Sequence, residues 1–139
     1  MVSLDYSNNK DSHMPLVLFE IRDNIALLTL NNPEKRNMLT FEVCEMIVDY
    51  VAQAEQHPDV KALIVTGNGP AFCAGGQLTD ITADQLMLEN IYSGFLSIAQ
   101  CELPTIAAVN GPAVGAGFNM AVGCDVRIVT EKSTLVLAL

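Results

Sequence analysis

The first part of the chain alternates apolar and polar residues with the period of a β-strand. This alternation covers residues 16–21 and 25–31, and the Asp23-Asn24 pair between them is typical of a tight turn. The chain is therefore predicted to open with an antiparallel β-hairpin. The preceding residues 1–13 are polar and aperiodic, so we expect a flexible N-terminal extension there.

Farther along, helical periodicity alternates with short, continuous apolar runs. Apolar side chains recur three or four positions apart in the helical segments, whereas the apolar runs have the composition of strands covered on both faces. The predicted helices are 40–56, 83–100 and 113–122, and the predicted strands are 61–67, 103–111 and 125–129. This order indicates an α/β fold with mostly covered strands, in a single domain over 14–139.

Composition excludes several classes of protein. The chain has 16 acidic against 7 basic residues and a formal net charge of −9, which disfavours nucleic acid as a partner. No apolar run approaches the roughly 18 residues of a membrane helix, so we expect no membrane partner. The start lacks the features of a secretory signal, and the four cysteines form no C-x-x-C pair. We therefore expect a cytoplasmic protein with reduced thiols and no metal.

Two glycine-containing segments, "FCAGGQL" and "NGPAVGAGFN", each follow a predicted buried strand. Neither completes a phosphate-binding motif, no G-x-S-x-G is present, and neither His13 nor His57 lies beside a strand end. If the two strands are neighbours, free backbone N–H groups could converge on one oxygen as an oxyanion hole, with Gly75 and Gly76 allowing φ > 0. The alternative is that these glycines serve turn geometry alone.

Three blocks, "NNPEKRNML", "FCAGGQL" and "PTIAAVNGPAVGAGFNMAVGCDVRI", together resemble the enoyl-CoA hydratase/isomerase family, also called the crotonase family. The resemblance runs from about residue 16 to 135. It implies a crotonase-like spiral of repeated β-β-α units, truncated after about half of the domain. It also implies an acyl-CoA thioester substrate, a role in fatty acid metabolism and assembly as a homotrimer or hexamer. No cofactor is expected, because coenzyme A is part of the substrate.

The resemblance also assigns site residues. The amides that hold a thioester enolate fall at Gly76 and Ala116, and Asn119 is the third catalytic position. The residues expected to bind the acyl-CoA substrate are Lys35, Arg36, Met38, Ala74, Gly75, Gly76, Gln77, Leu78 and Ala116. Lys35 and Arg36 are the only adjacent basic pair in the chain, suited to coenzyme A phosphates, although a solvated helix flank is the alternative.

The sequence departs from the family's hydratases at the catalytic acids. Asn119 stands where they carry the first of two glutamates, and an asparagine cannot exchange a proton at neutral pH. The second glutamate would fall near Leu139. Gln77 replaces a common aspartate and is expected to serve loop geometry, while Asp125 and Cys73 are expected to be structural.

The last residues, "STLVLAL", are strongly apolar, and we expect the sequence to be the N-terminal portion of a longer enzyme. Its expected reaction is hydration or double-bond isomerisation of an enoyl-CoA thioester through an enolate. Two alternatives stay open. One is a non-catalytic acyl-CoA-binding fragment or pseudoenzyme, and the other is a thioester hydrolase on the same fold.

Overall fold

The chain begins with the predicted hairpin. A computed structural model describes residues 14–76 and 85–137, so the expected extension 1–13 lies outside the described residues. Strand β1 (Val17–Arg22) pairs antiparallel with β2 (Ile25–Leu30). At the turn, Asp23 and Asn24 have φ of 50° and 67°, a left-handed conformation that asparagine and aspartate tolerate better than most residues. The hairpin prediction is confirmed.

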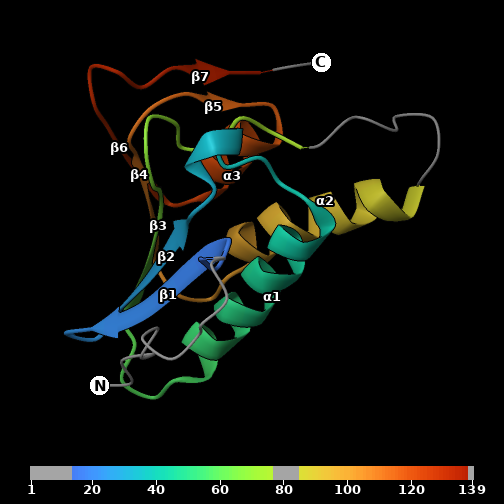
Figure 1. Ribbon diagram of the computed structural model, residues 1–139. Helices are drawn as coiled ribbons and strands as arrows, with labels where there is room; N and C mark the ends of the chain where they lie inside the picture. The colour runs from blue at the N-terminus through green and yellow to red at the C-terminus, as the bar shows by residue number, and fades with distance from the viewer. Residues whose placement is uncertain (1–13, 77–84, 138–139) are drawn as a thin grey trace.

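A five-stranded sheet forms the framework of the molecule (Figure 1). Its remaining strands are β3 (Ala62–Gly67), β4 (Thr105–Val109) and β6 (Val126–Val129), and the strand order is β1-β2-β3-β4-β6. From β2 onward every neighbouring pair is parallel. The C-terminal ends of these strands therefore meet at one edge, which is where parallel α/β sheets usually place their sites.

Helices α1 (Phe41–Gln56) and α2 (Gln85–Ala99) pack together on one side of this sheet (Figure 1). Helix α1 begins after Thr40, whose hydroxyl accepts a hydrogen bond from the Val43 N–H at 3.2 Å. The two helices approach closely because Gly94 has no side chain: a Cβ there would lie 2.8 Å from the Cys44 sulfur. The apolar stripe of α1 is buried in the core, as its periodicity predicted.

A second, smaller layer lies above the main sheet, and it completes the spiral (Figure 1). Its strands are β5 (Ala113–Val114) and β7 (Leu135–Val136), which pair in parallel. Single bridges extend the layer back along the chain, from Ala113 to Cys73 and from Gly76 to Leu39. Each turn of the chain thus supplies one long and one short extended segment before its helix, which confirms the expected repeat of β-β-α units.

The sequence reading was wrong in detail around the third helix. Helix α3 comprises Ala116–Gly123, whereas the prediction began it at 113. Gly115 has φ of +58° and cannot be helical, so residues 113–114 form β5 instead. Strand β7 and a short 3₁₀ turn over Pro33–Lys35 (η2) were not predicted. Both are too short for periodicity to reveal.

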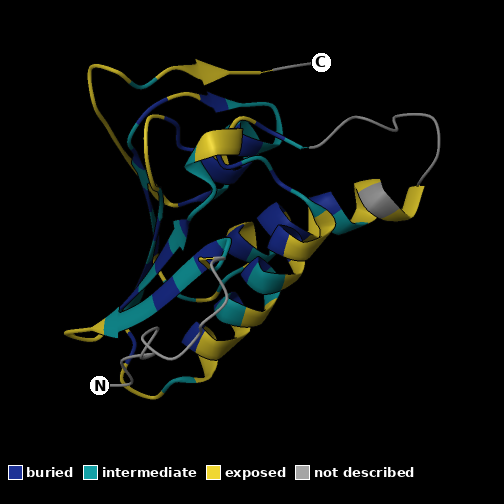
Figure 2. Ribbon diagram, in the orientation of Figure 1, coloured by how far each residue is buried: buried dark blue, intermediate teal, exposed yellow. Residues whose placement is uncertain are grey.

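Strand β6 departs from the expectation of covered strands. Its residues Val126, Ile128 and Val129 are 51%, 60% and 54% exposed, whereas β3 and β4 alternate buried and half-buried positions (Figure 2). Among the residues that the structure describes, no helix is long and apolar enough to cross a membrane.

Candidate functional site

The turn after β3 approaches the turn after β4 without an intervening side chain. Gly75 has φ of +107°, and a Cβ there would lie 2.9 Å from the Val114 carbonyl oxygen and 3.9 Å from the Ala116 nitrogen. Only glycine fits this position. The sequence reading gave Gly76 the same freedom, but its φ is not positive, and a Cβ there would meet only the Ile91 side chain. That part of the prediction is corrected.

Backbone hydrogen bonds join this turn to the segment after β2. The Ala74 N–H donates to the Arg36 carbonyl at 2.9 Å, and the Leu39 N–H donates to the Gly75 carbonyl at 2.8 Å. The structure therefore brings together two segments that the resemblance assigned to acyl-CoA binding. Lys35 and Arg36 are exposed, and Met38 is half-buried. The predicted positions Gln77 and Leu78 lie outside the described residues.

The side-chain amides of two asparagines, Asn37 and Asn110, donate hydrogen bonds to backbone carbonyls of the turn after β3. Asn37 is only 2% exposed, and its amide nitrogen donates to the carbonyls of Asn68 and Ala71 at 3.0 and 2.9 Å. Asn110 donates to the same Ala71 carbonyl at 3.1 Å. The sequence analysis missed both residues. The available signal was an asparagine at the end of a polar turn and another directly after a buried strand.

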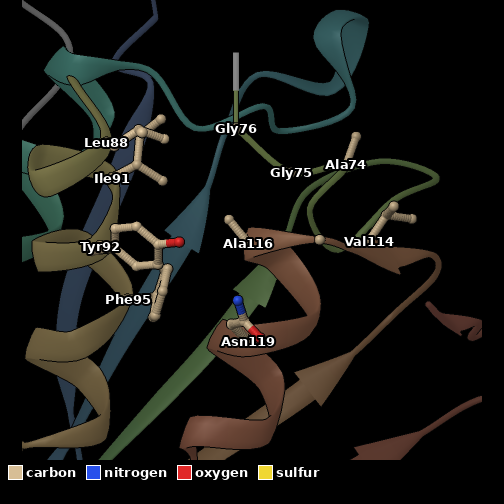
Figure 3. Close-up of a pocket in the computed structure, with 11 residues that line it drawn as sticks. Ala74, Gly75, Gly76, Leu88, Ile91, Tyr92, Phe95, Val114, Ala116 and Asn119 are labelled. Carbon is tan, nitrogen blue, oxygen red and sulfur yellow. The ribbon is translucent and has the colours of Figure 1, made fainter. Parts of the chain in front are cut away.

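The two residues predicted to supply backbone N–H donors line one cavity. Gly76 ends the described part of the first turn, and Ala116 is the first residue of α3 (Figure 3). Neither N–H donates a hydrogen bond to another described residue. The Ala116 N–H also lies at a helix N-terminus, whose partial positive charge favours an anion. The two predicted donors thus line the same cavity.

The cavity has a volume of about 340 Å³. Besides Ala74, Gly75, Gly76 and Ala116, the predicted residue Asn119 lines it from α3, where it is half-buried. Helix α2 forms the opposite wall (Figure 3). Its lining residues, which the sequence analysis did not identify, are Leu88, Ile91, Tyr92 and Phe95. The helical stripe of 83–100 could have indicated them, but not which of its faces borders a cavity.

No described lining side chain carries a charge or a titratable imidazole or carboxyl group. Cys73, directly before the cavity turn, is fully buried, and burial raises its pKa to about 12, so it stays a thiol and fills space as expected. Asp125 is structural as expected: it accepts from the Thr105 N–H at 2.9 Å. The described residues include no group of His, Cys, Asp or Glu suited to a metal.

The site therefore combines two backbone donors, an apolar wall and an asparagine, and contains no described proton acceptor that would be charged at neutral pH. Such an arrangement can stabilise an oxyanion and orient a polar group. Leu139, near which the resemblance placed the second glutamate, lies outside the described residues.

Comparison with known proteins agrees with this fold. The sequence model of the enoyl-CoA hydratase/isomerase family matches residues 20–138. The chain belongs to the enoyl-CoA hydratase/isomerase family, and its fold is the crotonase fold.

Among curated relatives, the probable enoyl-CoA hydratase EchA14 of Mycobacterium tuberculosis is 45% identical, over 81% of this chain and 46% of that protein. The 1,2-epoxyphenylacetyl-CoA isomerase of Escherichia coli is 31% identical, over 90% of this chain and 51% of that protein. A solved enoyl-CoA hydratase/isomerase from Xanthobacter autotrophicus superposes with a TM-score of 0.80 at 32% identity, covering 87% of this chain and 48% of that one. The chain thus spans about half the length of the relatives it matches.

Proposed function

We propose that the protein acts on an enoyl-CoA thioester, by hydration or double-bond isomerisation, through an enolate held by two backbone amides. The observation that carries the proposal is the pair of undonated N–H groups, on Gly76 and Ala116, that border one cavity. A thioester carbonyl oxygen placed between them gains negative charge as the enolate forms. Donors fixed in advance stabilise that charge more than the neutral carbonyl.

Binding of the coenzyme A portion is assigned to the segments that the turn joins. Ala74 and Gly75 would lie against the nucleotide, and Lys35 and Arg36 present two exposed positive charges for its phosphates. Lys35 and Arg36 form no ion pair with any described residue, so both charges remain available. No separate cofactor enters this scheme, because coenzyme A is part of the substrate.

Asn119 is proposed to orient the substrate or a water molecule without transferring a proton. The acid or base for the reaction then lies outside the described residues. A site in which Asn119 orients the substrate and another residue transfers the proton fits a double-bond shift, which needs one carboxylate. It also fits a hydration that uses a single acid. We also propose a homotrimer or hexamer acting in the cytoplasm in fatty acid metabolism, as the resemblance to the family implies.

A second candidate, a non-catalytic acyl-CoA-binding protein, is favoured by one observation: the described cavity lining contains no carboxylate. One experiment separates the two candidates. The full chain would be titrated with butyryl-CoA by calorimetry, and then supplied with crotonyl-CoA and with a 3-enoyl-CoA while the absorbance of the conjugated thioester is followed. Turnover of either substrate supports the enzyme, binding without turnover supports the second candidate, and absence of binding overturns both.

A further inference from the structure

The segment after β2 contains two consecutive residues with a left-handed backbone. Arg36 and Asn37 have φ of 51° and 57°. This conformation is uncommon for residues other than glycine, although asparagine adopts it more readily than most. The Asn37 N–H donates to the Asn32 carbonyl at 2.9 Å, which closes residues 32–37 into a compact turn. A strained turn of this kind persists where its surroundings hold it in place.

The side chain of Asn37 holds this turn from inside the protein. Its Oδ1 accepts from the Asn32 N–H at 2.8 Å, within the turn itself. Its amide nitrogen donates across to the turn after β3, to the Asn68 and Ala71 carbonyls at 3.0 and 2.9 Å. Both amide donors and the acceptor are used, and the residue is 2% exposed, so these contacts fix the side chain in one orientation. One buried residue therefore joins the two segments.

The end of β3 leaves room for this amide. A Cβ on Gly67 would lie 2.8 Å from the Asn37 Nδ2 and 2.6 Å from the Ala71 carbonyl oxygen, so the hydrogen-bonded groups occupy the space of a side chain. Beside this contact, the left-handed Arg36 directs its carbonyl to the Ala74 N–H at 2.9 Å. Ala74 begins the part of the turn that borders the cavity (Figure 3). The turn that carries Arg36 is thus bonded directly to the turn that borders the cavity.

We propose that Asn37 is a positioning residue for the proposed reaction, because it fixes the basic pair, Lys35 and Arg36, relative to the turn that leads to Gly76. The phosphates and the thioester carbonyl belong to one substrate molecule. When the basic pair holds the phosphates, the carbonyl meets the Gly76 N–H only if the two segments keep a constant separation. Asn37 does not line the cavity and acts through the segments it joins. This inference rests on the proposed function, because it takes both binding assignments from it.

Asn110 provides a comparison within the same structure. Its amide nitrogen donates to the Gly69 and Ala71 carbonyls at 3.0 and 3.1 Å. Its Oδ1 accepts from the Gly67 N–H at 3.1 Å. Asn110 therefore holds the turn after β3, as Asn37 does, but none of these bonds reaches residues 32–38. Loss of the Asn110 amide should disturb only the carbonyl end of the substrate, whereas loss of the Asn37 amide should disturb both ends.

The test measures the two ends of the substrate separately on the full chain. Calorimetry gives the dissociation constant of adenosine 3′,5′-bisphosphate, which has nucleotide phosphates but no thioester. Carbon-13 NMR of butyryl-CoA labelled at the thioester carbonyl reports hydrogen bonds to that oxygen, because they move its resonance downfield. Asn37→Gly removes the side chain and tolerates the left-handed φ. We expect it to raise the dissociation constant about 10-fold, the scale of one net hydrogen bond, and to reduce the bound carbonyl shift by about half or more.

Two other asparagine variants serve as controls. Asn110→Ala should reduce the carbonyl shift while leaving the nucleotide dissociation constant within about 2-fold of the wild-type value. Asn31→Ala should change neither, because the Asn31 side chain bonds to the Pro15 carbonyl and the Asn68 side chain, at 2.9 and 2.8 Å. If folded Asn37→Gly kept the wild-type dissociation constant or the wild-type carbonyl shift, and lost only stability in urea, Asn37 would serve the fold alone and the inference would be overturned.

A measurement on the wild-type chain decides the case if Asn37→Gly does not fold. Binding of adenosine 3′,5′-bisphosphate to the basic pair should slow exchange of the Asn37 side-chain amide protons with solvent by about 10-fold, because the two segments then separate less often. Unchanged exchange rates would overturn the inference. The proposed function fails separately, if the wild-type chain binds neither the nucleotide nor butyryl-CoA.

Discussion

The turn after β3 and the turn after β4 meet at the cavity, but only the first is also held by buried side-chain amides. The first is tied by directed hydrogen bonds: Asn37 and Asn110 share the Ala71 carbonyl, and the Arg36 and Leu39 backbones bond to Ala74 and Gly75. The first turn therefore depends on donors and acceptors from two other parts of the chain, residues 36–39 and Asn110.

The second turn is joined to the first by backbone hydrogen bonds at Pro112 and Val114, and glycines set how closely the two segments approach. A Cβ at Gly111 would lie 2.0 Å from the Pro70 carbonyl oxygen, and one at Gly117 would lie 2.2 Å from that of Cys73. Real Cβ contacts are never this short, so the second turn can rest against the first only with glycine at both positions. The relative position of the two proposed donors, on Gly76 and Ala116, thus depends on the asparagine hydrogen bonds of the first turn and on the close backbone contacts between the two segments.

The largest expected effect comes from breaking the close packing. Gly117→Ala and Gly111→Ala should each destabilise the fold by about 3 kcal/mol or more, because the new methyl meets rigid backbone. The measurement is urea unfolding followed by circular dichroism. Gly76→Ala is the control, since its methyl would meet only the flexible end of Ile91, at 3.0 Å. Equal stability of Gly117→Ala and Gly76→Ala would contradict this account.

The second largest expected effect is a loss of turnover when one of the two proposed hydrogen-bond donors is removed. Gly76→Pro deletes the N–H, and the removal of one oxyanion donor costs roughly 100- to 1000-fold in turnover, with a smaller effect on ground-state binding. Steady-state turnover of an enoyl-CoA measures the effect, and Gly76→Ala, which keeps the N–H, separates it from a change of shape. A folded Gly76→Pro variant that retained more than about a tenth of wild-type turnover would show that the glycines serve the turn alone.

A smaller effect is expected at Asn119, which borders the second turn. Asn119→Ala should lower turnover by about 10- to 100-fold, the scale of a lost orienting contact, without abolishing it. Asn119→Asp provides the contrasting case, because it restores a carboxylate at the hydratase position. If that variant strongly raised hydration of crotonyl-CoA, Asn119 would not mark an isomerase-like site.

The effect that is smallest at neutral pH concerns Cys73, whose carbonyl accepts the Val114 N–H where the turns meet. Burial raises its pKa, and that of Cys44, from 9.0 to about 12. Above pH 9 the unfolded chain releases these protons while the folded chain keeps them, so the free energy of unfolding should fall as pH rises from about 9 toward 12 and should be insensitive to these groups below that range. Urea unfolding at a series of pH values measures the slope.

The matched variant for this prediction is Cys73→Ala, which keeps a small apolar side chain in the same space. It should make the decline above pH 9 shallower. A decline of equal slope in the variant and the wild-type protein would assign the effect to other groups.

Features that repeat along the chain were predictable from sequence. The alternation over 16–31 predicted the hairpin, and the apolar runs predicted β3 and β4. Both were detectable because a buried strand requires apolar residues at several positions in a row or in alternation. The glycine segments indicated close approach between two turns, and the resemblance assigned Gly76 and Ala116 to one site, which agrees with their place on one cavity. Their role as donors stays a prediction.

Features that depend on contacts between distant segments were not predictable. Asn37 gains its role only because residues 68–71 pass beside it, and Tyr92 reads as one more position on an amphipathic helix until α3 is placed opposite. The exposure of β6 is of the same kind: three of its four residues are apolar, and their exposure became evident only from the three-dimensional arrangement. The pattern of residues within one segment does not reveal which distant segments will pack against it.

The order of strands in the main sheet also has a consequence for biosynthesis. Apart from the opening hairpin, each long strand pairs on one side with the strand that was translated just before it: β3 on β2, β4 on β3, and β6 on β4. A chain emerging from the ribosome can therefore add one repeat at a time to a surface that already exists, without waiting for a distant partner. Antiparallel β1 occupies the opposite border, so growth proceeds in a single direction.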